Sequence, residues 1–314
     1  MVCGSAQLQS RFGYAVVSGA NKGIGFETVR QLAAAGATVV LTARNQKRGV
    51  EAANRLHRSG LSNVLFHQLD VQDAQSIHSL ALFIQTRRFQ SLDILVNNAG
   101  ATGVEVDEDG LRAKNIDPEI WLAGKAVDMI QDVMKTTYEA AKEYIQTNYY
   151  GVKNLTEGLL PLLQRSISGA RVVNVSSLRG ELSCVVMTQR VPDERRRREL
   201  GDIDTLTEEK IERILRQFLQ DVQRGAIEAN GWQKMLPAYS ISKVTLNAYT
   251  RLFARKHPDM CVNCVHPGYV DTDLNWHTGP LTVEEGARGS VMLALLPDGG
   301  PTGCYFDRTN VACF

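Results

Sequence analysis

The chain has 314 residues, and its 35 Lys and Arg residues against 34 Asp and Glu give a formal net charge of +1. This balance excludes a general electrostatic attraction to nucleic acid or to an anionic membrane surface. Hydrophobic residues make up 44% and charged residues 22%, which excludes a disordered or fibrous protein and allows a large α/β domain with a sizeable core.

Short β-branched runs alternate with helical patterns along the chain, which is typical of a Rossmann-type, doubly wound parallel sheet with helices on both faces. The first strand is predicted at residues 14–18, and the first helix at residues 24–35, where Gly36 ends it. Further strands are predicted at residues 38–42, 64–68, 93–97, 171–176 and 261–265 and at Tyr305, and further helices at residues 46–58, 73–89, 138–163 and 239–257. We expect a single α/β domain over residues 1–314.

Two long insertions, at residues 101–135 and 178–238, interrupt this alternation. Joints between such elements commonly have about 2 to 6 residues. Both insertions follow the carboxyl end of a strand, where open α/β sheets bind ligands, so we expect them to form walls or a lid of a substrate cleft. An apolar stripe in the second insertion predicts an amphipathic helix that covers an apolar surface. Its members are Ile211, Ile214, Leu215, Phe218, Leu219 and Val222.

A glycine-rich turn with Gly19, Gly23 and Gly25 connects the first predicted strand to the first helix. Glycines there let backbone N–H groups and the helix N-terminus approach a pyrophosphate, although glycine also serves ordinary turns. The second strand leads into Arg44 without the carboxylate that would bind an NAD ribose. Arg44 and Lys22 suit a 2′-phosphate, which favours NADPH, and the alternative is that both are ordinary exposed cations.

Tyr239 and Lys243 are four residues apart, on one face of a predicted helix. An ammonium near the phenol favours tyrosinate and lowers the pKa of the tyrosine. Bringing that pKa from about 10 to near 7 requires about 4 kcal/mol, more than we expect from Lys243 alone, and a positively charged nicotinamide would add to it. A chance Tyr and Lys pair on a solvated face is the alternative.

Five motifs follow one another in a fixed order from about residue 18 to residue 307. They are the glycine-rich turn, Asn97-Asn98-Ala99-Gly100, Ser176-Ser177, Tyr239 with Lys243, and His266-Pro267-Gly268 followed by Thr272. In this order the chain resembles the short-chain dehydrogenase/reductase family.

The resemblance implies a catalytic role for four residues. Tyr239 would act as acid or base at the substrate oxygen, and Lys243 would hold the nicotinamide ribose and tune Tyr239. Ser177 would polarise the carbonyl, with Ser176 as the alternative serine, and Asn148 would join a proton relay.

The resemblance also implies cofactor contacts along the whole chain. Asp70 is assigned to the adenine, Asn97 to the adenosine ribose side, and Val270 with Thr272 to the nicotinamide carboxamide. Asp70 could instead cap the next helix, Asn97 could satisfy backbone groups, and Pro267-Gly268 could merely turn the chain. The full expected set is Gly19, Asn21, Lys22, Gly23, Ile24, Gly25, Arg44, Asp70, Val71, Asn97, Ala99, Tyr239, Lys243, Pro267, Gly268, Val270 and Thr272.

The long insertions, together with residues 147–151 and 295–300, resemble more narrowly a plant branch of the family. This branch contains salutaridine reductase and menthone (neomenthol) reductases and is related to the monomeric carbonyl reductases. It implies NADPH-dependent reduction of a small, apolar cyclic ketone of terpenoid or alkaloid type to a secondary alcohol. Two alternatives stay open: an enone double-bond reductase of the same family, whose sequence lacks the tyrosine, and a cofactor-binding module without turnover.

The second insertion also bears on assembly. In tetrameric family members the connection between the serine and the tyrosine is short, and the helix with Tyr and Lys packs between subunits. Here the apolar stripe could cover that helix face within one chain, which predicts a monomer, and a dimer contact through the stripe is the alternative.

Three further signals carry less weight. Cys261 and Cys264 resemble half of a zinc or redox motif, but no second pair completes it and we predict no metal. The basic run at residues 195–198 is read as a solvated loop rather than a nucleic-acid contact, and His266 as a packed residue. The six cysteines (Cys3, Cys184, Cys261, Cys264, Cys304 and Cys313), the lack of a secretory signal pattern and the lack of a membrane-spanning run favour a cytosolic protein.

Overall fold

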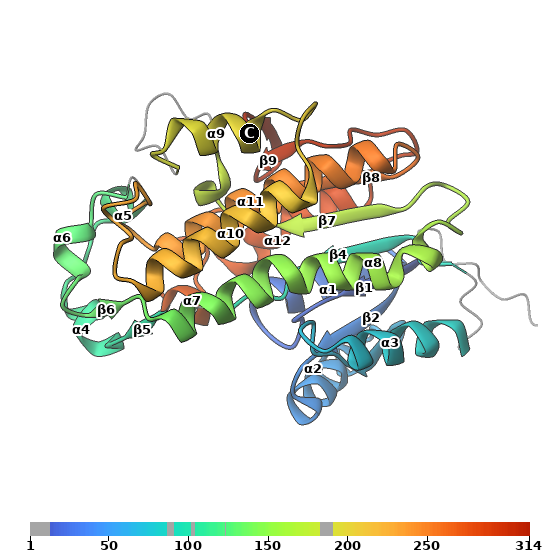
Figure 1. The fold of residues 1–314 in the computed structure, drawn as a ribbon. Helices are drawn as coiled ribbons and strands as arrows, with labels where there is room; N and C mark the ends of the chain where they lie inside the picture. Colours follow the sequence, from blue (N-terminus) through green and yellow to red (C-terminus); the bar gives the residue numbers. More distant parts are fainter. Residues whose placement is uncertain (1–12, 87–90, 102–103, 123, 183–190) are drawn as a thin grey trace, which may run out of the picture.

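The computed structural model describes residues 13–86, 91–101, 104–122, 124–182 and 191–314. Its main sheet has the strand order β10-β9-β8-β7-β4-β1-β2-β3 (Figure 1). The strands are β1 (Tyr14–Val17), β2 (Thr38–Ala43), β3 (Val64–Gln68), β4 (Ile94–Asn97), β7 (Arg171–Val175), β8 (Cys261–His266), β9 (Tyr305–Asp307) and β10 (Asn310–Ala312). All neighbours pair in parallel except β9 and β10. The predicted Rossmann-type fold is therefore confirmed, and strand order reverses between β1 and β4.

Helices cover both faces of the sheet and create two apolar cores. On β1, Val16 belongs to one core, whereas Ala15 and Val17 belong to the other, as the two-residue period of a strand requires. One core includes residues of α1 (Gly23–Ala34), α2 (Gln46–Arg58) and α12 (Val283–Ala294), and the other those of α3 (Ala74–Thr86), α8 (Gly151–Leu163) and α11 (Pro237–Lys256). Burial on both faces explains the nearly continuous apolar strands.

The helix predicted at residues 138–163 is present, and it contains a π-helical segment that the sequence does not indicate. It consists of α7 (Tyr138–Ile145), the π-helical segment η1 (Gln146–Tyr150) and α8. Such π-helical turns are frequent at functional sites because they redirect side chains within a helix. Here the turn contains Asn148, one of the predicted catalytic residues.

The first insertion forms a small layer with its own apolar cluster. It contains β5 (Glu105–Val106), α4 (Glu108–Ala113), α5 (Pro118–Leu122), α6 (Val127–Ile130) and β6 (Met134–Lys135). Its cluster, which includes Trp121 and Ile130, also takes in Met235 from the second insertion and Trp276 from the segment after β8. The insertion is thus fastened to two other segments that border the cleft.

The second insertion contains η2 (Leu178–Gly180), α9 (Glu194–Gly201) and α10 (Glu208–Gln223). The predicted amphipathic helix is α10, and its apolar stripe packs in the core shared with α7 and α11, with Leu219 half-buried and the other members buried. Lys153 on α8 forms ion pairs of 2.8 Å with Glu208 and Glu212 on α10. The stripe is therefore covered within the chain and does not form the exposed face that a dimer contact would need.

The basic run at residues 195–198 corrects one expectation, because it lies in the helix α9 and not in a loop. The Asp193 side chain caps this helix by accepting from the Arg196 N–H at 2.7 Å. The Arg196 guanidinium is buried and lies 3.9 Å from the Trp232 ring centroid, a cation–π arrangement that a solvated loop would not provide. Within the described residues, no helix is long and apolar enough to cross a membrane.

Candidate active site

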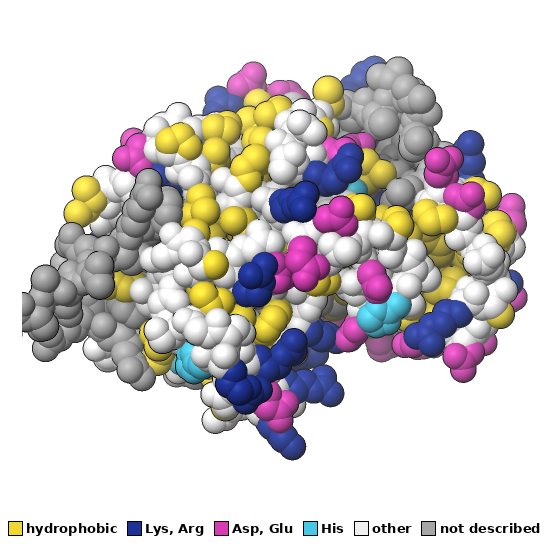
Figure 2. Space-filling model, turned by 180° about the vertical axis from the view of Figure 1, so that it is seen from behind, with side chains coloured by type: hydrophobic (Ala, Val, Ile, Leu, Met, Phe, Trp, Pro, Cys, Tyr) yellow, Lys and Arg dark blue, Asp and Glu magenta, His cyan; other side chains and the backbone are white. Residues whose placement is uncertain are grey.

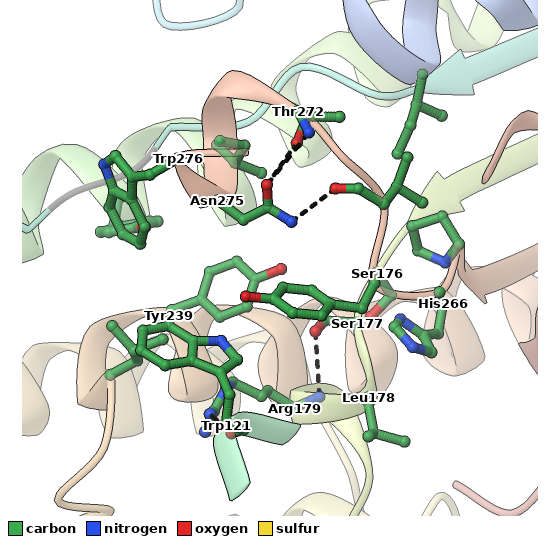
Figure 3. Close-up of a pocket in the computed structure, with 18 residues that line it drawn as sticks. Trp121, Ser176, Ser177, Leu178, Arg179, Tyr239, His266, Thr272, Asn275 and Trp276 are labelled. Carbon is green, nitrogen blue, oxygen red and sulfur yellow. Dashed lines mark hydrogen bonds between the residues drawn. The ribbon is translucent and has the colours of Figure 1, made fainter. Parts of the chain in front are cut away.

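A cavity lies beyond the carboxyl ends of β7 and β8, lined by residues from both insertions and from the core strands (Figure 3). Trp121 comes from the first insertion, and Arg179 lies just after Ser177 at the start of the second. Seven residues of the predicted site meet on its walls: Ile24, Ser177, Tyr239, Pro267, Gly268, Val270 and Thr272. The expected position at the carboxyl edge of the sheet and the expected role of the insertions as walls are both found.

The glycine-rich turn forms a tight backbone cradle at the start of α1. Gly19 and Gly23 have φ values of +63° and +58°, and residues other than glycine rarely adopt this backbone conformation. A Cβ atom on Gly25 would lie 2.3 Å from Asn98 Nδ2, and one on Gly19 would lie 2.8 Å from Ala99 Cα. The absence of side chains at Gly19 and Gly25 therefore lets the turn pack directly against Asn98 and Ala99. A tight turn of this shape at a helix N-terminus fits a dinucleotide pyrophosphate.

Asn98 and Ser18 hold this cradle, and sequence reasoning did not single them out. Asn98 Nδ2 donates to the carbonyl oxygens of Ser18 at 2.9 Å and Gly19 at 3.2 Å. Ser18 Oγ in turn accepts from the backbone N–H groups of Asn98 and Ala99, each at 3.0 Å. The end of β4 therefore fixes the shape of the turn after β1.

The Asn97 side chain lies inside the protein. The residue is 2% exposed, and its Nδ2 donates to Thr156 Oγ1 at 3.0 Å and Asn174 Oδ1 at 2.8 Å. Successive side chains of a strand point to opposite faces, so Asn98 reaches the cradle while the Asn97 side chain is directed into the protein. The Asn97 side chain thus connects β4 with β7 and α8, and the contact expected between this residue and the adenosine ribose stays a prediction.

Two further adenosine-side residues make local contacts. Asp70 Oδ1 accepts from the Gln72 N–H at 3.0 Å, while Asp73 Oδ1 accepts from the Gln75 N–H at 2.9 Å at the start of α3. The Val71 side chain packs where a Cβ on Gly151 would lie, 2.7 Å from Val71 Cγ2. The cofactor contacts of Asp70 and Val71 stay predictions.

The two cations expected at a 2′-phosphate differ in their surroundings. Arg44 is exposed directly after β2, beside Lys47 and Arg48 at the start of α2, and Figure 2 shows Lys and Arg side chains gathered at this projecting end of the molecule. Lys22 instead forms an ion pair with Asp273 after β8, which holds the pKa of that carboxyl below its usual value. The charge of Lys22 is thus partly neutralised, which leaves Arg44 as the stronger candidate.

The paired serines separate into two roles. Ser176 Oγ donates to Asn247 Oδ1 on α11, so this hydroxyl fastens the segment after β7 to the helix. Ser177 Oγ accepts from the Arg179 N–H at 3.2 Å and forms a hydrogen bond with the Tyr239 side chain that lowers the pKa of the phenol. Ser177 is therefore the serine that meets Tyr239, as expected from the resemblance.

Tyr239 is half-buried at the start of α11. Burial raises the pKa of its phenol, and the hydrogen bond to Ser177 and the charge of Arg179 act in the opposite direction. The ring meets the edge of the Tyr144 ring at a centroid distance of 5.9 Å, and Lys243 Nζ lies 5.8 Å from the ring centroid.

Lys243 and Asn148 complete the predicted set. Lys243 Nζ donates to the Val175 carbonyl oxygen at 2.8 Å, and burial lowers the pKa of the ammonium to about 8. Asn148 Oδ1 accepts from the Ala101 N–H at 3.1 Å, and its Nδ2 donates to Ser242 Oγ at 3.3 Å. Asn148 therefore reaches α11 one residue before Lys243, and the structure brings all four predicted catalytic residues to one region.

The sequence reading missed several cavity residues: Trp121, Tyr144, Leu236, Tyr269 and Trp276. Most of them belong to the insertions or to loops, where no periodicity indicates which side chains face a cavity. Tyr144 has helical spacing that an ordinary core residue shares, and Arg179 has no signal except its place two residues after Ser177.

Outside this set, His266 is buried and lines the cavity. The thiols of Cys261 and Cys264 donate to separate carbonyl oxygens, those of Gly300 at 3.6 Å and Cys304 at 3.7 Å. In the part of the chain that the structure describes, no group of three metal-ligating side chains comes together.

Comparisons with known proteins agree with this geometry. A family model described as short chain dehydrogenase matches residues 13–189. Short-chain dehydrogenase/reductase 1 of Saponaria officinalis is 50% identical, with 96% of each chain covered, and (+)-neomenthol dehydrogenase of Arabidopsis thaliana is 47% identical, with 96% of this chain and 98% of the relative covered. The structure of salutaridine reductase from Papaver somniferum matches with a TM-score of 0.85 and 46% identity, covering 94% of this chain and 99% of that one. The chain therefore belongs to the short-chain dehydrogenase/reductase family of oxidoreductases, which use a nicotinamide cofactor.

Proposed function

We propose that this enzyme reduces the carbonyl group of a cyclic ketone of terpenoid or alkaloid type to a secondary alcohol, with NADPH as reductant. The observation that carries the proposal is the position of Ser177 and Tyr239 on the wall of a cavity with largely aromatic and aliphatic lining, with Lys243 Nζ 5.8 Å from the Tyr239 ring centroid. Relatives named neomenthol dehydrogenase and salutaridine reductase support this substrate class.

The reduced nicotinamide supplies a hydride to the carbonyl carbon when it is bound. The Ser177 hydroxyl, which hydrogen-bonds to the Tyr239 phenol, would donate its proton to the carbonyl oxygen of a ketone that binds between the two hydroxyls. The hydrogen bond from Ser177 to the carbonyl oxygen strengthens in the transition state, because negative charge grows on that oxygen. Tyr239 then gives its phenolic proton to the same oxygen, which completes the alcohol and leaves tyrosinate.

The chain must then return a proton to Tyr239. Burial lowers the pKa of Lys243 to about 8, so its ammonium releases a proton more readily than an ordinary lysine does. Asn148 bonds to Ser242, which precedes Lys243 on α11. We assign Asn148 to the positioning of this end of the helix and to the relay of protons.

Replacement of the phenol tests the reaction directly. Tyr239→Phe should abolish ketone-dependent NADPH oxidation and leave NADPH affinity nearly unchanged, because it removes a proton donor that acts in the transition state. Tyr138→Phe, a change of the same kind outside the cavity lining, is the matched control and should keep its activity. Near-normal turnover by Tyr239→Phe would overturn the assignment, and a wild-type enzyme that binds NADPH but turns over no ketone would favour the non-catalytic alternative.

We also propose a preference for NADPH over NADH. Arg44 is exposed where β2 ends, and Ala43 offers no carboxylate to an NAD ribose. Fluorescence titration should show that Arg44→Ala weakens NADPH binding far more than NADH binding. Lys22→Ala should have a smaller effect, since Asp273 already pairs with this ammonium. Equal weakening of both cofactors by Arg44→Ala would contradict a contact with the 2′-phosphate.

The same fold supports a proposal about assembly: a monomer built as one domain. The α10 stripe, with Ile211, Ile214 and Phe218 each 0% exposed, covers the face of α11 that would otherwise be free for another subunit. Light scattering coupled to size exclusion should give a single mass near that of one chain. A stable tetramer would refute the covering role, and the cytosolic location stays a prediction from the sequence.

A further inference from the structure

Arg179 places a buried positive charge on the wall of the cavity that Ser177 and Tyr239 share (Figure 3). The residue is 5% exposed, and its Nη2 donates to the Trp121 carbonyl oxygen at 3.0 Å. Its side chain therefore extends from the segment after β7 to the first insertion. Because water is largely excluded there, the charge is poorly screened from its neighbours.

The backbone holds Arg179 in a fixed relation to the reactive groups. Its own N–H donates to Ser177 Oγ, and the next residue, Gly180, accepts from Asn247 Nδ2 on α11 at 3.0 Å. A Cβ on Gly180 would lie 2.6 Å from this Nδ2 and 3.0 Å from the Lys243 carbonyl oxygen. The segment with Arg179 thus packs against the helix that carries Tyr239, at a distance that only glycine permits.

A permanent positive charge near Tyr239 would stabilise its tyrosinate form, which the surroundings of the ring otherwise disfavour. Burial opposes the formation of tyrosinate, and Lys243, the other cation beside the ring, has a pKa lowered to about 8, so that it loses charge as the pH rises above neutrality. A guanidinium stays protonated over this whole range. The remaining titratable groups on this part of the cavity are Tyr144 of α7, His266 at the end of β8, and Tyr269 after that strand.

We propose that Arg179 is a positioning residue for the reduction, supplying a permanent positive charge that stabilises Tyr239 as it gives up its proton. This inference rests on the proposed function of Tyr239 as proton donor. Arg179 exchanges no proton itself: the phenolic proton passes to the carbonyl oxygen, the hydride comes from NADPH, and the negative charge left on the phenolate forms in the cavity whose wall includes Arg179. The direction of the influence of Arg179 on the Tyr239 pKa agrees with this role.

The test separates charge from shape with two variants. Arg179→Gln keeps an N–H donor for the Trp121 carbonyl but removes the charge, whereas Arg179→Lys keeps the charge. Ultraviolet difference absorbance against pH reports tyrosinate formation, and subtraction of the same titration for Tyr239→Phe isolates the contribution of Tyr239. If Arg179→Gln does not fold, as judged by circular dichroism, Arg179→Met replaces it in the same comparison.

We expect Arg179→Gln to move the ionisation of Tyr239 to higher pH by about one pH unit or more, and Arg179→Lys to stay close to wild type. In ketone reduction, Arg179→Gln should lower kcat by up to about ten-fold with little change in KM. An unchanged titration for Arg179→Gln, or equal displacements in both variants, would overturn the proposal. A KM increase confined to ketones that carry a carboxylate, with no change in the titration, would overturn it in favour of substrate recognition.

The titration needs no substrate, so it tests the effect of Arg179 on Tyr239 independently of the proposed ketone reduction. A wild-type enzyme that reduces no ketone defeats the proposed function, while the titration still decides whether Arg179 governs the ionisation of Tyr239. A wild-type enzyme that reduces ketones with an unmoved titration in Arg179→Gln defeats only the present inference.

Discussion

Lys243 should destabilise the enzyme that it serves, in a manner that depends on pH. Its side chain is buried, and its pKa falls from the ordinary value of 10.5 to about 8. The folded protein thus binds the proton more weakly than the unfolded chain does. At 1.36 kcal/mol per pKa unit, holding a protonated Lys243 in the folded state costs about 3 kcal/mol.

The sign of the pH dependence follows from this difference. The cost is fully present below pH 8, where both states are protonated, and it disappears as the pH rises to 10.5, where the unfolded chain also loses the proton. Lys243→Met removes the cost but leaves the Val175 carbonyl without its 2.8 Å hydrogen bond, a penalty of about 1–3 kcal/mol that does not depend on pH. The informative quantity is therefore how the stability difference between variant and wild type changes with pH.

Urea unfolding of both proteins without cofactor, at a series of pH values from neutral to alkaline, measures this difference. We expect the free energy of unfolding of Lys243→Met minus that of wild type to be about 3 kcal/mol larger at neutral pH than above pH 10.5, so that the variant is relatively more stable at neutral pH. Lys125→Met, at an exposed lysine, is the control and should give a difference that does not change over this range. A flat difference for Lys243→Met, or one with the opposite slope, would refute the reasoning.

Three further outcomes follow from contacts in the structure. Gly25→Ala should greatly weaken NADPH binding in a fluorescence titration, because its Cβ would lie 2.3 Å from Asn98 Nδ2. The control Gly201→Ala, whose Cβ would meet nothing closer than 4.0 Å, should bind NADPH as wild type does. Equal affinities of the two variants would contradict the role of the glycine-rich turn. Phe218→Ala should lower the free energy of unfolding by about 3–5 kcal/mol in urea, since the ring is 0% exposed under α11, and a loss below 1 kcal/mol would show that α10 is not part of the core. Asn148→Ala should reduce kcat more than NADPH affinity in steady-state and binding assays, and unchanged kcat would remove it from the relay.

Much of the fold could be predicted because each parallel strand has its own signal. The boundaries of α2 and β3 agree with the predicted ranges, and the motifs that carry the chemistry come directly after strands, so their meeting at one edge follows from the topology. The pair Tyr239 and Lys243 also needed nothing beyond helical spacing.

The rest depended on three-dimensional packing. Asn97 and Asn98 are adjacent and alike, and only the register of β4 decides which amide reaches the cradle. The π-helical turn around Asn148 and the helix α9 have no sequence signal of comparable strength. The position of the Arg179 side chain depends on its hydrogen bond to the Trp121 carbonyl oxygen of the first insertion. These two residues are 58 positions apart, so the sequence does not indicate the contact.

The central claim, transfer of hydride to a carbonyl carbon with Tyr239 as proton donor, can be tested with labelled cofactor. The enzyme is incubated with a cyclic enone and NADPH that carries deuterium at the transferring position of the nicotinamide, and the product is analysed by mass spectrometry and NMR. We expect wild type to form an unsaturated secondary alcohol with deuterium on the carbinol carbon. We expect Tyr239→Phe to form none of this product. A saturated ketone with deuterium on the carbon β to the carbonyl would contradict it and identify a double-bond reductase.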